Sequence, residues 1–171
     1  MESATLDFAS WPIRLVAYLI DDILPIIGGI LIVMGLFFGL FWGIESLFED
    51  DGVSVIGEIG VLAIIGLLVT IMGAGILIGY VVWWLVALGR AQTPGKQIVG
   101  IRAVDYAGEP LGWGMMFVRE FLFKRLLFGS LYALTLGILF LVDNLWPLWD
   151  DNNQTLHDKV VNTYVVYVPK A

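Results

Sequence analysis

The 171-residue sequence contains no cysteine and a single histidine, His157. Without cysteine, the chain has no disulfide, no thiolate metal site and no thiol nucleophile. One histidine excludes a histidine-based metal cluster, and no Ser-His-Asp set or other nucleophile motif accompanies it. We therefore expect no enzymatic activity, no bound metal and no cofactor.

Charged residues are also scarce, and positive charge is the scarcer kind. They make up 15% of the chain, with 9 Lys and Arg against 16 Asp and Glu, which gives a net charge of −7. This acidic balance argues against nucleic acid as a partner and against a broadly basic surface for anionic lipids. Hydrophobic residues make up 59%, too many for an ordinary soluble domain. The composition predicts an integral membrane protein whose main partner is the lipid bilayer.

Two long apolar stretches predict a helical hairpin across the bilayer, at about residues 13 to 44 and 59 to 88. The first is longer than a bilayer requires, and Pro25 is its expected break because the proline nitrogen cannot donate a helical hydrogen bond. Small-residue stripes are expected to let the two helices approach closely. Their members are Gly35, Gly39 and Gly43 in the first helix and Gly75 and Gly79 in the second.

Charge distribution predicts the orientation of the hairpin. The loop of residues 45 to 58 carries five acids and no Lys or Arg, so it should face outward. The loop of residues 89 to 118 carries Arg90, Lys96 and Arg102, so it should be cytoplasmic, with the N-terminus on the same side. These features predict a multi-pass protein of the cell membrane. The β-branched run KQIVGIRAVD within this loop predicts a short strand, and VVNTYVVYV near the C-terminus has a similar composition.

A third hydrophobic unit follows, with an expected span at about residues 126 to 146 and a polar C-terminal segment at 150 to 171. One interpretation is an interfacial helix followed by a single third span. The other bends the chain at Gly129 and Ser130 into a short hairpin, which makes four spans. The fold class expected is therefore an all-α membrane protein with three or alternatively four transmembrane helices and a small cytoplasmic strand-like segment.

The segment GRAQTPGKQ between the second span and the predicted strand invites comparison with a phosphate-binding loop. Pro94 removes an amide donor, Gln97 replaces the required Ser or Thr, and the glycine spacing is too long by one residue. We therefore exclude nucleotide binding there. A tight turn is expected instead, with Lys96 facing the lipid headgroups.

Four blocks of sequence, in order, are similar to the RDD family of small membrane proteins. They are RLVAYLID from Arg14 to Asp21, TPGK from Thr93 followed by IVGIRAVDYAG, then Arg119, and finally TLHDKVVNTYVV from Thr155. The resemblance implies Arg14 and Asp21 as signature residues, with Asp158 as the second aspartate. It also implies transport, including cation/proton exchange, or a role as an assembly partner in membrane complexes.

Arg14 and Asp21 are about two helical turns apart, on one face but too far apart to pair directly. Each must find a partner elsewhere: headgroups or cytoplasmic acids for Arg14, and a cation, a proton or a basic residue such as Arg119 for Asp21. Three hypotheses follow for these charges. They are a structural latch between helices, an ion or proton site with Asp22 as a second carboxylate at its mouth, or anchors at the membrane interface.

Two functions remain open at this point. The first is a small cation- or proton-coupled transporter, with Asp21 as the acceptor of a monovalent cation or proton. We expect it to form an oligomer, because so few helices cannot easily enclose a path. The second is a non-catalytic membrane adaptor that binds a larger membrane complex or a second copy through its glycine stripes.

Overall fold

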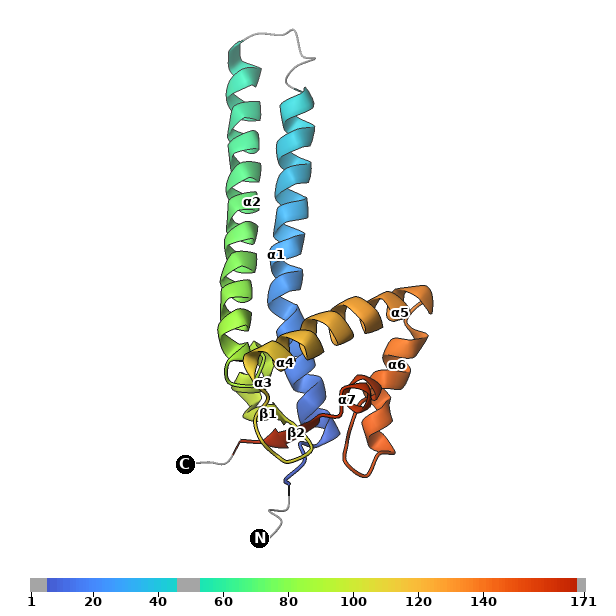
Figure 1. Cartoon of the computed structure of the whole chain (residues 1–171). Helices are drawn as coiled ribbons and strands as arrows, with labels where there is room; N and C mark the ends of the chain where they lie inside the picture. Colours follow the sequence, from blue (N-terminus) through green and yellow to red (C-terminus); the bar gives the residue numbers. More distant parts are fainter. Residues whose placement is uncertain (1–5, 46–52, 169–171) are drawn as a thin grey trace. The chain divides into compact units, whose positions relative to one another are not determined.

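The computed structural model describes residues 6 to 45 and 53 to 168, with side chains described for all of these except residues 43, 45 and 53 to 59. The chain is mostly helical and divides into two compact units. We call residues Asp22–Val82 the hairpin unit, and residues 1 to 21 together with 83 to 171 the terminal unit. The elements are α1 (Trp11–Glu45), α2 (Val53–Leu88), α3 (Pro94–Val99), β1 (Ile101–Val104), α4 (Trp113–Phe117), the π-helix η1 (Val118–Phe128), α5 (Gly129–Leu134), α6 (Ile138–Leu145), the 3-10 turn η2 (Trp146–Leu148), α7 (Leu156–Val160) and β2 (Tyr164–Tyr167) (Figure 1).

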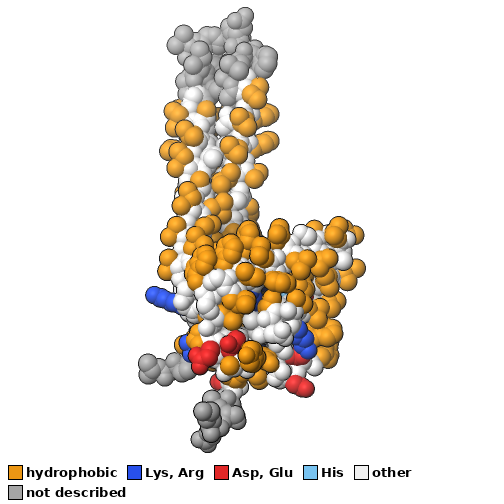
Figure 2. All heavy atoms as spheres, viewed as in Figure 1, with side chains coloured by type: hydrophobic (Ala, Val, Ile, Leu, Met, Phe, Trp, Pro, Cys, Tyr) orange, Lys and Arg blue, Asp and Glu red, His pale blue; other side chains and the backbone are white. Residues whose placement is uncertain are grey.

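The hairpin unit contains most of α1 and most of α2, which run side by side in opposite directions (Figure 1). Residues 23 to 44 and 60 to 82 carry no charge, and hydrophobic side chains cover the visible face of both helices (Figure 2). The stretches Trp11–Trp42 and Gly60–Leu88 are long and apolar enough to cross a membrane. Contrary to the expected break, α1 continues as one helix through Pro25. Residues 46 to 52 of the acidic loop expected to face outward lie outside the described residues, as do the side chains of the rest of that loop.

The close approach of α1 and α2 depends on glycines that differ in part from the predicted ones. A Cβ on Gly66 would lie 2.6 Å from the Gly39 nitrogen, and one on Gly35 would lie 2.5 Å from the Gly66 carbonyl oxygen. Gly28 and Gly73 meet in the same way farther along the pair. These contacts place backbone against backbone, as small residues permit in membrane helices.

Gly75 and Gly79 do not take part in this packing, and that prediction is wrong. Both are exposed, and a Cβ at either would meet nothing within 4 Å. Two residues correspond to about 200° around an α-helix, so Gly75 faces away from the contact that Gly73 makes. The surroundings of Gly43 lie outside the described side chains.

In the terminal unit, β1 and β2 form a two-stranded antiparallel sheet in which Ile101 pairs with Tyr167 and Val104 with Tyr164. The segment before α1 runs along β2, where the Ala9 amide donates to the Val165 carbonyl at 2.9 Å. A small core joins these parts, formed by the fully or nearly fully buried residues Ala9, Ala17, Ile101 and Val165. The segments around Ala9 and Val165 are therefore held against the loop that follows α2.

Residues 126 to 146 do not form the continuous third span that we predicted. The chain is helical from α4 through η1 to α5, then breaks at Leu136 and Gly137, which both have positive φ (49° and 84°). The Gly137 amide closes the end of α5 by donating to the Tyr132 carbonyl at 2.7 Å. The turn lies farther along than Gly129 and Ser130, the bend of the alternative prediction. The eight residues of α6 extend about 12 Å, too short to cross a bilayer.

Gly66→Ala should destabilise the protein by about 1 to 3 kcal/mol, because the added methyl group has to push the α1 backbone away. Gly75→Ala is the matched control, since it adds the same methyl group on the same helix into open space. Thermal unfolding in detergent measures both. Equal melting temperatures for the two variants would contradict the observed helix contact.

Candidate functional site

A buried charge cluster lies in the terminal unit, and we define it as Arg14, Lys96, Arg119, Glu120 and Asp158. Its members come from α1, α3, η1 and α7. All five side chains are at most 9% exposed. Charges buried to this degree are stable only when they are paired and hydrogen-bonded.

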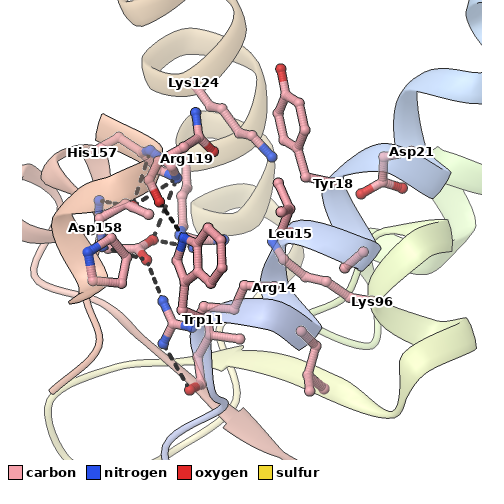
Figure 3. A pocket seen from close by; sticks show the side chains of 16 residues that line it. Trp11, Arg14, Leu15, Tyr18, Asp21, Lys96, Arg119, Lys124, His157 and Asp158 are labelled. Carbon is pink, nitrogen blue, oxygen red and sulfur yellow. Dashed lines mark hydrogen bonds and ion pairs between the residues drawn. The ribbon is translucent and has the colours of Figure 1, made fainter. Parts of the chain in front are cut away.

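Asp158 lies between two guanidinium groups (Figure 3). Arg14 Nη1 donates to Asp158 Oδ2 at 3.0 Å, and Arg119 Nη2 donates to Asp158 Oδ1. Arg14 also donates through Nε and Nη2 to the carbonyl oxygens of Ala9 and Val165, each at 3.0 Å. One arginine therefore binds α7, the segment before α1 and β2 at the same time.

Arg119 also binds the next residue in the cluster, Glu120, whose carboxylate is contacted by three cationic side chains. Arg119 Nη1 donates to Glu120 Oε1 at 2.5 Å, and Lys96 Nζ donates to the same oxygen. Lys124 Nζ lies 3.6 Å from Glu120 Oε2. The remaining Arg119 donor, Nε, binds the Thr163 hydroxyl at 3.0 Å. Glu120 therefore joins α3 to η1.

Burial and mutual charge shift the pKa values in this cluster. Burial lowers the pKa of the Lys96 ammonium to about 8, and the positive charge of Arg119 acts in the same direction. Burial alone would raise the pKa of the Glu120 carboxyl, but the surrounding cations, Lys96 first among them, hold it well below its usual value. Burial would likewise raise the pKa of Asp158, but the combined attraction of its neighbours, Arg119 first among them and Arg14 also contributing, holds that pKa below its usual value. Both carboxylates thus stay ionised at neutral pH.

Asp21 does not bind Arg119, the basic partner suggested for it by the sequence. Thr93 Oγ1 donates to Asp21 Oδ2 at 2.5 Å, and the Gly95 amide donates to Asp21 Oδ1 at 2.7 Å. Thr93 is also the N-cap of α3. A Cβ on Gly95 would collide with the Ala17 carbonyl oxygen, so glycine permits the close approach of the TPGK turn to α1. Asp21 therefore anchors this turn.

A second buried group adjoins the cluster at His157. His157 Nδ1 lies 2.8 Å from Asp143 Oδ2, and the Tyr132 hydroxyl donates to that same oxygen at 2.5 Å. Thr155 and Asp158 form a capping box at the start of α7. These bonds tie α6 to α5 and α7.

The structure brings together three of the five predicted site residues, Arg14, Arg119 and Asp158. Asp21 lies nearby with other partners, and Asp22 is half-buried and belongs to the hairpin unit. Sequence reasoning missed Glu120 and Asp143 and misplaced Lys96, which is 7% exposed rather than facing headgroups. A lone acid inside the apolar run LFLVDNL was the available signal for Asp143.

Comparison with known proteins agrees with this arrangement of motifs. The model of the RDD family matches residues 8 to 162, which include every residue of the charge cluster. The chain belongs to the RDD family. It is therefore a membrane protein of that family, with two candidate spans among the described residues.

Two curated relatives of this RDD protein are the proline-rich antigen homologs of Mycobacterium tuberculosis strains CDC 1551 / Oshkosh and ATCC 25618 / H37Rv. Each is 29% identical over 106 residues, which cover 53% of this chain and 40% of the relative. The matched region thus spans less than half the length of these relatives. No solved structure matches the chain.

Asp158→Asn should destabilise the RDD protein by about 3 to 5 kcal/mol, because two guanidinium groups would stay buried without their shared carboxylate. Asp105→Asn is the control, since Asp105 accepts backbone amides in an exposed turn and an asparagine oxygen can replace it. Thermal unfolding and folded yield in detergent measure the difference. Equal stability of the two variants would show that the guanidinium groups have other counter-charges.

Proposed function

We propose that this RDD protein is a non-catalytic membrane adaptor in which the charge cluster acts as a structural latch. The observation that carries the proposal is that every carboxylate around the cluster is already bound by the chain itself. Asp158 and Glu120 bind cationic side chains, and Asp21 binds the Thr93 hydroxyl and the Gly95 amide. Carboxylates that already have partners within the chain favour a role in holding the terminal unit together over a role in binding a metal cation.

Two further observations support an adaptor. Gly75 and Gly79 form a small-residue step on α2 that no described part of the chain fills, and such steps suit the close approach of another helix. In addition, the matched region makes up only 40% of each mycobacterial relative. In those proteins it is combined with other sequence, as expected of an adaptor module. A second copy or a larger membrane complex would supply the approaching helix.

Replacing both Gly75 and Gly79 with Leu should disrupt assembly without unfolding the monomer, because the new side chains would fill the open step. Protein extracted in mild detergent and run on a native gel should change from an assembly to a monomer. Gly29→Leu is the control, because Gly29 also faces open space but lies on α1 outside this step. A monomeric wild-type protein, or equal disruption by the control, would refute the proposed surface.

Proton- or cation-coupled transport is the second candidate, and one specific observation favours it. Asp21 and Lys96 line the same cavity, and a lysine whose pKa is about 8 gains and loses a proton near neutral pH. A coupled mechanism needs a buried group of this kind.

Lys96→Met in sealed liposomes that contain a pH-sensitive dye separates the two functions. If the protein transports protons or exchanges them for cations, the wild-type protein should acidify or alkalinise the lumen on a sodium or potassium gradient, and Lys96→Met should not. Asp105→Asn is the control, because it removes a charge in an exposed turn that does not line the cavity. Absence of any wild-type flux in folded, reconstituted protein would exclude transport and leave the adaptor.

A further inference from the structure

The terminal unit contains a cavity of about 50 Å³ beside the charge cluster. Four cationic side chains line it, from α1, α3 and η1: Arg14, Lys96, Arg119 and Lys124 (Figure 3). The carboxylates on its wall are Asp21 and Asp158. The wall therefore carries two more positive than negative charges. Glu120 and Asp143, which contact Lys96 and His157, are not among the lining residues.

The two carboxylates on the wall already accept hydrogen bonds, whereas the two lysines keep unused hydrogen-bond donors. Asp158 accepts from two guanidinium groups, and Asp21 accepts from a hydroxyl and an amide. An ammonium group has three hydrogens, and Lys96 donates to Glu120 alone among the described contacts. The excess of positive charge on the wall and the unused ammonium donors both favour the binding of an anion in this cavity.

Lys124 is the cation least committed to its internal partner. Its ammonium lies 3.6 Å from Glu120 Oε2, which is longer than a hydrogen bond. It also lies 4.7 Å from the centre of the Tyr18 ring, so the ring holds it at the cavity (Figure 3). Its side chain is 16% exposed, against 9% for Lys96. Lys124 can therefore turn toward a bound group without breaking the charge cluster.

We propose that this cavity binds the phosphate group of an anion, with Lys124 and Lys96 as its principal ligands and Arg14 supporting them. The cavity is large enough for such a group, because one buried water needs about 10 to 15 Å³ and a cavity of about 50 Å³ has room for several atoms of that size. Lysine is a common point-charge partner of phosphate. The source is either free inorganic phosphate or a lipid headgroup. The headgroup is a natural source because Trp11, which also lines the cavity, is the first residue of a candidate span.

The test measures equilibrium binding of radiolabelled inorganic phosphate to the full chain in an uncharged detergent. Lys124→Gln should weaken binding by about ten-fold, because it removes one charge-assisted contact. Arg125→Gln is the matched control, since it removes the same charge from the adjacent, exposed position of η1. Lys124→Arg should restore most of the affinity. Thermal unfolding without phosphate confirms that each variant is folded.

A second arm distinguishes the two sources by using nanodiscs of phosphatidylcholine with and without phosphatidic acid, with the melting temperature as the readout. A rise with phosphatidic acid that Lys124→Gln abolishes assigns the site to headgroups. Saturable binding of inorganic phosphate without that rise assigns it to the free anion. If neither probe binds, or if Lys124→Gln and Arg125→Gln weaken binding equally, the proposed site does not exist.

Discussion

The terminal unit depends on the burial of one carboxylate, that of Asp158, between two guanidinium groups. A buried ion pair gains little over an apolar contact of the same shape, but losing one member leaves its partner charged in a medium that solvates it poorly. Here each member holds further segments in place. Arg14 binds the carbonyls of Ala9 and Val165, and Arg119 leads through Glu120 to α3. Segments from both ends of the sequence are thus placed by the same few charges.

The sequence predicted the parts of the molecule that follow from hydrophobic length and from motif. Two long apolar runs predicted α1 and α2, and the family motifs singled out Arg14, Arg119 and Asp158. The partners could not be predicted in the same way. Arg14 and Asp158 are 144 positions apart, and Asp21 meets a hydroxyl and an amide where a formal charge was expected. Positive-inside reasoning treats each lysine as a topological marker, so it cannot detect that Lys96 is buried against a carboxylate.

The remaining errors share a geometric cause. A hydropathy pattern averages over many residues, so the predicted third span ran through Leu136 and Gly137. In the structure, these two consecutive residues have left-handed backbone conformations and end a helix. Glycine spacing identifies stripes on a helix but not the stripe that faces its neighbour. On α2 the face that meets α1 contains Gly66 and Gly73, whereas the equally regular pair farther along points away. A choice between two such faces requires the rotation of each helix about its axis, which only packing determines.

The charge of the whole chain and the charge at the cavity have opposite signs, and the difference changes how the composition should be interpreted. A net charge of −7 argues against a broad basic surface. The net charge does not determine the potential inside a small enclosed cavity. There, the low dielectric constant strengthens the interactions of the few charges that face inward, and solvent screens the charges outside. Positive residues are scarce in this chain, and four of its nine Lys and Arg line one cavity. Their gathering there is therefore a property of the fold, and local charge at that cavity is the quantity that decides what it can bind.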